Sequence, residues 1–276
     1  MQNRIREAML EARSLLARRE MGERIAEFDV RGTLYGLARE VAPEARDADL
    51  LLMQRWIRPR LNETVADLAA GTGFLTAALT SWTKGSIIAI DPSWKQLQHI
   101  ERAIPTVKTI TMGSDDESLL EYVAPDSFDL VTSFGGLHHA RDHKQLMRNI
   151  DEMLKPGGRC IVGDIEKGSA LAKHFDEVVA KKCLTGHEGI TWWSSESIEQ
   201  LIKGTRLRLV RSELVKEHIW KFDSEKQMAM FFQALHAYDL SHAEIVADLK
   251  EALGVWEADG KVCLSWPMFL FELIKI

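Results

Sequence analysis

One short segment, 65–74, constrains the fold of this chain more than any other. It begins with an apolar run over 65–68, which is typical of a buried strand, and Gly71 and Gly73 follow that run. Glycine permits backbone angles and close approaches that a side chain would block, so the pair predicts a tight turn. Helix-forming residues come next, over 74–79. Because ligands of open α/β sheets bind at the carboxyl ends of strands, we expect a binding site at this turn.

The next predicted strand, 86–90, ends in an acid, Asp91, about 20 residues past the glycine turn. A carboxylate in this place can accept hydrogen bonds from both hydroxyls of a ribose. The alternative is that Asp91 only caps a helix, with Pro92 in the first turn of that helix. The order of strand, glycine turn, helix, strand and acid favours a nucleoside site.

Two kinds of cofactor carry such a nucleoside, and the residues around the turn favour one of them. A nicotinamide dinucleotide needs a third glycine or alanine, which brings the helix close behind the pyrophosphate. This chain has Thr76 in that place. Asp67, at the end of the first strand, would repel a pyrophosphate but attract a cation. S-adenosylmethionine carries a sulfonium and an ammonium group, so the sequence favours it; a nicotinamide-dependent oxidoreductase is the alternative.

With these features the chain resembles the class I S-adenosylmethionine-dependent methyltransferases. It is most similar to their small-molecule branch, which includes the ubiquinone and menaquinone methyltransferases. The matching segments are 67–73, 90–93, 128–131 with the downstream 137–139, and 154–158, all within about residues 50 to 165. The resemblance implies an α/β fold: a Rossmann-like, doubly wound, mostly parallel seven-stranded sheet with an antiparallel last strand. It also implies S-adenosylmethionine as cofactor.

The same resemblance implies which residues contact the cofactor. They lie at or just after the carboxyl ends of the predicted strands: Asp67, Ala69, Gly71, Gly73, Asp91, Pro92, Ser114, Asp115, Ser133 and Phe134. Asp91 would hold the ribose hydroxyls, and Asp67 would lie near the methionine ammonium group. Either Ser114 or Asp115 would accept a hydrogen bond from the adenine amino group, and the sequence leaves these two open.

Two adjacent histidines, His138 and His139, follow the fourth predicted strand, 128–133. Imidazole has a pKa near neutrality, so either residue is a candidate catalytic base. We expect His138 to be the more exposed of the two and His139 to be structural. Positioning of the acceptor for in-line attack can supply the acceleration without a base, and this alternative stays open. No metal is expected, because the histidines here do not complete a set of ligands.

The acceptor pocket has to come from segments outside the matching region. The candidates are aromatic and histidine side chains: Tyr35, Trp192, Trp193 and His236. The two adjacent tryptophans lie in a predicted loop, where aromatic rings can face a cleft. We therefore expect methyl transfer to an O, N or C nucleophile of a small, apolar or aromatic organic molecule. A non-catalytic S-adenosylmethionine-binding protein would show the same cofactor pattern and is the second alternative.

The rest of the chain is expected to add helices to this domain. Residues 1–60 predict an N-terminal helical lid, and 61–276 the methyltransferase domain. Within the latter, 207–210 and 214–220 predict a long strand, and 262–274 a last one. The segment from about 224 to 254 predicts a helical insertion near the C-terminus between the two.

Composition limits the kinds of partner and the cellular location that we expect. A formal net charge of −6 argues against a general nucleic-acid binder, which needs a basic face. The three cysteines fit no disulfide framework, and the amino terminus has no signal-peptide pattern, so we expect a cytoplasmic location. No apolar run approaches the roughly 20 residues of a membrane span. The expected protein is a monomer or homodimer that acts on a small molecule.

Overall fold

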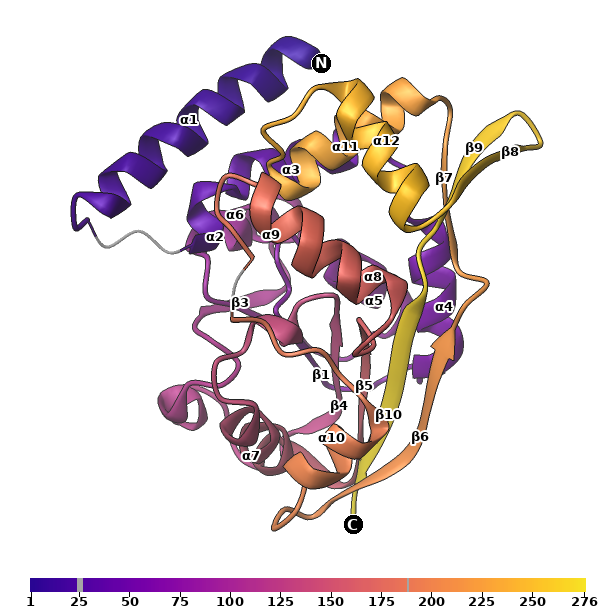
Figure 1. Cartoon of the computed structure of the whole chain (residues 1–276). Coiled ribbons are helices and arrows are strands. Elements are labelled where there is room, and N and C mark those ends of the chain that lie inside the picture. The colour runs from indigo at the N-terminus through magenta and orange to yellow at the C-terminus, as the bar shows by residue number, and fades with distance from the viewer. Residues whose placement is uncertain (24–26, 188) are drawn as a thin grey trace. The chain divides into compact units, whose positions relative to one another are not determined.

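The computed structural model describes residues 1–23, 27–187 and 189–276. The chain forms two compact units (Figure 1). Unit one comprises Met1–Asp49, Gly168–Glu188 and Lys216–Pro267, and unit two comprises Leu50–Lys167, Gly189–Val215 and Met268–Ile276. Unit one thus brings together the N-terminal helices and the C-terminal helical segment. The lid function expected of 1–60 stays a prediction.

Unit two is built on a seven-stranded sheet of order β3-β2-β1-β4-β5-β10-β6. The strands are β1 Val65–Leu68, β2 Ile87–Asp91, β3 Lys108–Thr111, β4 Phe128–Phe134, β5 Leu154–Asp164, β6 Leu207–Val215 and β10 Met268–Lys275. β1 to β5 pair in parallel, whereas β10 runs antiparallel to both β5 and β6. Figure 1 shows β1, β4, β5 and β10 side by side. The expected fold class is confirmed.

Polar side chains cap several helices of unit two. They are α5 Phe74–Trp82, α6 Trp94–Ala103, α7 His143–Met153, α10 Ser195–Leu201 and most of α4 Asp47–Ile57. Ser93 accepts the N–H of Gln96, and Asp142 accepts those of Lys144 and Gln145. Such caps satisfy donors that have no partner within the helix. The resulting helix starts lie directly after the strands that the sequence places before them.

The core of unit two lies between the sheet and its helices. Leu68, Val131 and Val162 come from three neighbouring parallel strands, and Leu146 and Ile150 come from α7. The last two are four residues apart, so they lie on one face of the helix. All five are fully buried. Burial of this apolar face stabilises the sheet by the hydrophobic effect and fixes the carboxyl ends of its strands.

Unit one combines helices with a small sheet. Its elements are α1 Gln2–Glu20, α2 Glu27–Val30, α3 Gly32–Val41, α8 Ala170–His174, η3 Phe175–Val179, α9 Ala180–Lys182, α11 Glu225–His236, α12 His242–Ala252, β7 Ile219–Phe222, β8 Val255–Ala258 and β9 Lys261–Ser265. α3 packs along α11 (Figure 1), and both helices carry buried apolar residues, which include Leu34 and Leu37 on α3 and Phe231 and Phe232 on α11. The two expected helices within 224–254 are confirmed as α11 and α12.

A buried acid connects three segments within unit one. Asp49 is fully buried and accepts hydrogen bonds from Arg46 Nε (2.7 Å), His218 Nε2 (2.6 Å) and Trp220 Nε1 (2.7 Å). Burial alone would raise the pKa of Asp49, but the Arg46 guanidinium and the His218 and Trp220 donors together lower it. A buried carboxylate with this many donors stays ionised, and it holds the chain of 216–220 against the N-terminal segment.

Two expected strands are each divided in the structure, so the predictions of single strands were wrong. The segment 214–220 turns after β6, and its end joins β7, which pairs antiparallel with β9. The segment 262–274 is divided into β9 and β10 at Trp266 and Pro267, because proline donates no hydrogen bond to a strand ladder. In both places the partner strand is distant in sequence, and the apolar pattern alone does not show it.

Within the described residues, the structure has no helix that is both long enough and apolar enough to span a membrane.

The C-terminal strand generates a stability prediction. Lys275 is almost fully buried, and its Nζ donates to the Asp126 carboxylate (2.6 Å) and to the carbonyls of Asp151 (2.6 Å) and Leu154 (2.7 Å). Lys275→Met should lower the free energy of unfolding by about 2–4 kcal/mol, because two buried carbonyls lose their donor. Urea unfolding followed by circular dichroism measures this loss. Lys84→Met, at an exposed lysine of the same unit, is the control and should be nearly neutral.

Candidate functional site

The turn after β1 has the backbone conformation that its glycines predict. Ala69, Gly71 and Gly73 all have positive φ, at 51°, 56° and 87°. Gly73 is the N-cap of α5, and a Cβ added there would lie 2.6 Å from Ile100 Cγ1 on α6. Glycine is therefore required at 73 both for its φ and for the approach of α6. Ala69 adopts the same left-handed region with a side chain, which is strained.

Asp91 joins this turn to the end of β2. One of its carboxylate oxygens accepts the N–H of Gly71 (2.8 Å), and the other accepts the N–H of Ser93 (2.8 Å). Pro92 lies between the two anchored positions. Ser93, and not Asp91, is the N-cap of α6. Asp91 therefore helps to fix the conformation of the turn. The helix cap that the alternative assigned to Asp91 is formed by Ser93.

Asp67 is a buried acid at the end of β1 that is held by a hydroxyl. Its carboxylate accepts the Thr76 hydroxyl at 2.5 Å. The pKa of Asp67 is raised to about 7, because burial and the negative charge of Asp91 raise it more than the hydrogen bond from the Thr76 hydroxyl lowers it. Thr76 is the residue that departs from the dinucleotide pattern. The structure shows that it hydrogen-bonds the acid at the end of β1, a pairing that sequence analysis missed.

The loop after β3 holds Ser114 and Asp115. One carboxylate oxygen of Asp115 accepts the backbone N–H groups of Arg141 (2.7 Å) and Asp142 (2.9 Å). The carbonyl of Ser114 accepts the side-chain amide of Asn149 (2.9 Å). These contacts connect the loop after β3 to the start of α7. Both candidates for the adenine contact are thus held in place by α7 and the loop before it.

The end of β4 contains a buried hydroxyl. Within 1–23, 27–187 and 189–276, Ser133 Oγ finds no hydrogen-bond partner, although the side chain is fully buried. Phe134 follows, and Gly163 on β5 leaves room for its ring, since an added Cβ would lie 2.6 Å from Phe134 Cδ2. An unpartnered buried hydroxyl is costly, so the position favours a polar ligand atom or a water nearby.

His138 lies in η2 Leu137–His139, directly after β4, and it forms an ion-pair-like contact with Asp164 at the end of β5. Nδ1 of the ring lies 2.5 Å from Asp164 Oδ1, and the backbone N–H of His138 donates to Oδ2 (3.2 Å). Asp164 Oδ1 also accepts the N–H of Ile165 (2.8 Å). A carboxylate at Nδ1 places the proton on that nitrogen and makes Nε2 the basic one.

The expected exposure of the two histidines was wrong. His138 is buried, at 3% exposure, while His139 is only half-buried. The reason is Asp164, which draws His138 inward and is 26 residues away in sequence. An acid at the carboxyl end of the fifth strand was the available signal. Asp164 is the residue of this site that sequence analysis did not single out.

Two of the predicted aromatic residues lie in unit two, and they differ in their surroundings. Trp192 lies beside the histidines, with its ring centroid 5.2 Å from that of His138. The N–H of Thr191 donates to the His138 carbonyl (3.3 Å), which holds the loop there. Trp193 belongs to the core of unit two and packs on Phe271 with ring centroids 5.3 Å apart. Packing accounts for Trp193 without a ligand.

Part of this chain is similar in sequence to known methyltransferases. A family model described as a methyltransferase domain matches residues 66–162. An uncharacterized methyltransferase of Schizosaccharomyces pombe is 26% identical over 211 residues, which is 70% of this chain and 70% of that protein. The demethylmenaquinone methyltransferase of Lactobacillus johnsonii is 32% identical over 115 residues, or 40% of this chain and 46% of that protein. The ubiquinone/menaquinone biosynthesis C-methyltransferase of an Enterobacter strain is 31% identical over 125 residues, or 42% and 49%. The chain thus spans about half the length of the quinone methyltransferases that it matches.

Solved structures show the same fold. The YcgJ protein of Bacillus subtilis aligns with a TM-score of 0.58 at 15% identity, over 83% of this chain and 98% of that one. A geranyl diphosphate methyltransferase in complex with S-adenosylmethionine aligns with a TM-score of 0.57 at 13% identity, over 92% and 93%. The chain contains a class I S-adenosylmethionine-dependent methyltransferase domain. The cofactor of this domain is S-adenosylmethionine, which decides against the nicotinamide alternative.

The residues of the methyltransferase domain fit this cofactor. Asp67 and Asp91 supply two acids near one turn, and a cation beside Asp67 would offset the burial that raises its pKa. The left-handed positions 69, 71 and 73 keep the turn free of bulky side chains. The hydroxyl of Ser133 offers a further polar atom. A buried acid that is hard to ionise alone suits a positively charged ligand better than a pyrophosphate.

The two remaining candidates, Tyr35 and His236, belong to unit one. Tyr35 lies on α3 and forms a hydrogen bond with Arg46. His236 ends α11, is buried, and stacks on Phe232 with ring centroids 5.5 Å apart. Burial lowers the pKa of His236 well below its usual value, and the charge of Arg31 lowers it further. His236 is therefore a neutral imidazole among aromatic rings.

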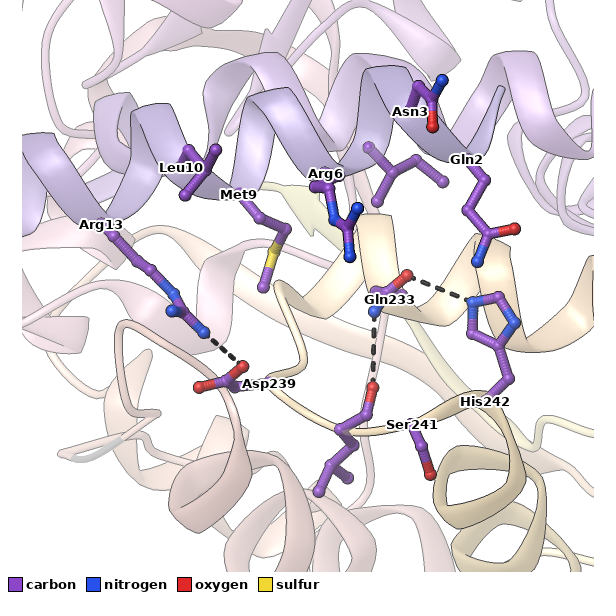
Figure 2. Close-up of a pocket in the computed structure, with 12 residues that line it drawn as sticks. Gln2, Asn3, Arg6, Met9, Leu10, Arg13, Gln233, Asp239, Ser241 and His242 are labelled. Carbon is purple, nitrogen blue, oxygen red and sulfur yellow. Dashed lines mark hydrogen bonds and ion pairs between the residues drawn. The ribbon is translucent and has the colours of Figure 1, made fainter.

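Unit one also contains an open pocket of about 560 Å³ between α1 and the segment 233–242 (Figure 2). Its walls include the ion pair of Arg13 with Asp239 and the hydrogen bond between Gln233 and His242. None of the site residues named from the sequence lines this pocket. The pocket shares no lining residue with the turn after β1.

The raised pKa of Asp67 predicts a pH dependence of stability. In the unfolded chain Asp67 loses its proton near 3.8, whereas in the fold it keeps the proton to about 7. Between these values the folded state binds more protons, so stability should fall as pH rises from about 4 to about 7. Asp67→Asn should flatten this fall and raise the free energy of unfolding at pH 7 by a few kcal/mol, since one pKa unit is about 1.4 kcal/mol.

Urea unfolding of both proteins at a series of pH values measures the effect. Glu117→Gln, at an exposed acid of the same unit, is the control and should keep the wild-type slope. An unchanged slope in Asp67→Asn would show that Asp67 is ionised throughout this range.

Proposed function

We propose that this chain transfers the methyl group of S-adenosylmethionine to an O, N or C nucleophile of a small, apolar or aromatic organic molecule. The observation that carries the proposal is the His138–Asp164 pair at the ends of β4 and β5, with Trp192 beside it. A buried base next to an indole ring suits a planar or apolar acceptor. The relatives named as quinone methyltransferases support an acceptor of this class.

The cofactor would be held by the turn after β1 and by the acids near it. Asp91 would accept from the ribose hydroxyls, beside its contact with the Gly71 N–H. Asp67 would attract the methionine ammonium, and its carboxylate would ionise as that charge approaches. Ser114 or Asp115 would contact the adenine. Bound S-adenosylmethionine supplies an electrophilic methyl group on a sulfonium.

His138 would act as the base for acceptors that carry a proton on the nucleophile. With Asp164 holding the proton of the neutral ring on Nδ1, Nε2 would accept the proton that the nucleophile loses. The imidazolium that results is stabilised by the adjacent Asp164 carboxylate. His139, whose ring centroid is 4.2 Å from that of His138, is the second candidate.

A methyl-transfer screen tests the proposed function. Purified protein is incubated with radiolabelled S-adenosylmethionine and a metabolite extract, and the products are separated by size and by solubility in organic solvent. We expect label in low-mass, organic-soluble compounds. Label confined to protein or nucleic acid contradicts the small-molecule acceptor, and an absence of label with intact cofactor binding indicates a non-catalytic binder.

The ribose assignment predicts the effect of Asp91→Ala. The change removes a charged hydrogen-bond acceptor, so affinity for S-adenosylmethionine should fall by roughly 1.5–3 kcal/mol in a protein that stays folded. Calorimetric titration measures the affinity. Glu121→Ala, at an exposed acid of the same unit, should bind as the wild type does. Equal affinities of the Asp91 and Glu121 variants would remove the ribose role.

The base assignment predicts a split between turnover and cofactor binding. His138→Ala should lower kcat by ~10²-fold or more and leave cofactor affinity nearly unchanged. Asp164→Asn should lower kcat as well, because the amide cannot fix the same tautomer of His138. His139→Ala tests the second candidate base, and it should retain most of the activity if His138 is the base. The wild-type rate should rise with pH as the base loses its proton, and this rise should be absent in His138→Ala. Normal turnover in that variant would leave positioning as the mechanism.

A further inference from the structure

Two adjacent glycines follow β4 in unit two, and glycine is needed at each for a different reason. Gly135 has a φ of 69°, in the left-handed region, but among the described residues a Cβ added there would meet no atom within 4 Å. Gly136 has a φ of −143°, outside that region. A Cβ added to Gly136 would lie 2.6 Å from the Cβ of Ala69 and 3.4 Å from its carbonyl oxygen. Position 136 therefore requires glycine for space, and Ala69 occupies that space.

Ala69 belongs to the turn after β1, and hydrogen bonds to β2 hold the residues that follow it. The N–H of Ala70 donates to the Ile90 carbonyl (3.1 Å). The N–H of Gly71 donates to the Asp91 carboxylate (2.8 Å). Ala69 itself keeps a left-handed φ of 51° with a side chain present, which fixes the direction of its methyl group. The position of that methyl group is thus set by the conformation of the turn.

The loop that follows β4 carries His138, and β5 holds this loop on one side. The N–H of Gly135 donates to the Gly163 carbonyl (2.7 Å), and the N–H of His138 donates to the Asp164 carboxylate (3.2 Å). β4 lies between β1 and β5 in the sheet, so the loop after it lies between the turn after β1 and the end of β5. Steric contact with the turn limits the movement of the loop on the β1 side.

We propose that Ala69 and Gly136 form a positioning pair, through which the turn that receives S-adenosylmethionine sets where the His138 ring lies. Gly136 is two residues before His138, so a shift of its backbone is carried to the ring. Close-packed groups are hard to compress, and carbon atoms attract each other best at about 3.5–4.0 Å. Movement of the Ala69 methyl group toward the loop must therefore move the loop. The inference rests on the proposed function, because it concerns the base proposed there.

Nuclear magnetic resonance of the histidine rings tests the inference without methyl transfer. The full chain, labelled with nitrogen-15 in its imidazoles, is saturated with S-adenosylhomocysteine, and the His138 signals are assigned by their loss in His138→Ala. We expect the cofactor to shift the His138 signals of the wild type. In Ala69→Gly, which removes the methyl group, the shift at saturation should be less than about half as large. A His138 shift in Ala69→Gly equal to that of the wild type overturns the proposal.

A double-mutant cycle tests the contact itself. Coupling between two sites is reciprocal, so a displaced loop must also change the affinity of the turn for the cofactor. Gly136→Ala should weaken binding of S-adenosylhomocysteine at least about tenfold, because the added methyl group overlaps Ala69. Adding Ala69→Gly opens the space, so the double variant should bind within about threefold of Ala69→Gly alone. Calorimetric titration measures the four affinities, and additive effects overturn the proposal.

Gly135→Ala is the matched control for this cycle. It strains the neighbouring residue through its positive φ, but its added Cβ reaches no atom within 4 Å in the part of the chain that the structure describes. Its effect on affinity should therefore add to that of Ala69→Gly. A coupling of Gly135→Ala with Ala69→Gly as large as that of Gly136→Ala would indicate general loosening of the loop and overturn the proposal. The resonance comparison needs only Ala69→Gly, so it decides the question even if Gly136→Ala does not fold.

The two proposals fail in different ways. A protein in which positions 69 and 136 are coupled but which methylates no small molecule contradicts the proposed function alone. A protein that methylates small molecules while the effects at positions 69 and 136 add contradicts only the positioning pair.

Discussion

The hydrogen bond from the Gly71 N–H to the Asp91 carboxylate is the contact on which the cofactor side of this structure depends. It joins the turn after β1 to the end of β2, so two adjacent parallel strands share one anchor. The backbone must take left-handed angles to direct that N–H, which explains glycine at 71 and 73. The same carboxylate fixes Ser93, which then caps α6. One buried acid thereby sets the geometry of both loops.

Charge balance decides what such a site can bind. Two acids lie near a single turn, and the pKa of one, Asp67, is raised because its burial is only partly offset by a hydroxyl. A negatively charged phosphate nearby would make ionisation of Asp67 more costly, whereas a sulfonium or ammonium group would make it less costly. The electrostatics and the methyltransferase match therefore point to the same cofactor from independent directions.

The parts that the sequence predicted well are those with local causes. The parallel strands are short apolar runs followed by glycine or acid, and the caps Asp142 and Ser194 lie directly before their helices. The errors arise where a partner strand that is distant in sequence sets the bounds of a strand. The expected strand over 214–220 was divided because β7 pairs with β9, more than forty residues later, for which no local pattern exists.

The site shows the same division between local and distant causes. The turn residues could be placed from spacing alone, because the turn is formed within a few residues. The burial of His138 could not, because it follows from Asp164 at the end of another strand. The partner of Asp67 was visible as a departure from a pattern, Thr76, but its hydrogen bond depends on how α5 packs.

The family model and the alignments with the quinone methyltransferases cover only part of the chain. The family match covers 66–162, which lies wholly in unit two, and the quinone methyltransferases align over 115 to 125 residues. Unit one is assembled from three segments, two of which interrupt the chain of the sheet after β5 and between β6 and β10. The segment that the family model matches thus lies in unit two, with the turn after β1. The acceptor therefore has to be inferred from residues outside 66–162, among which Trp192 lies beside the buried His138 of unit two.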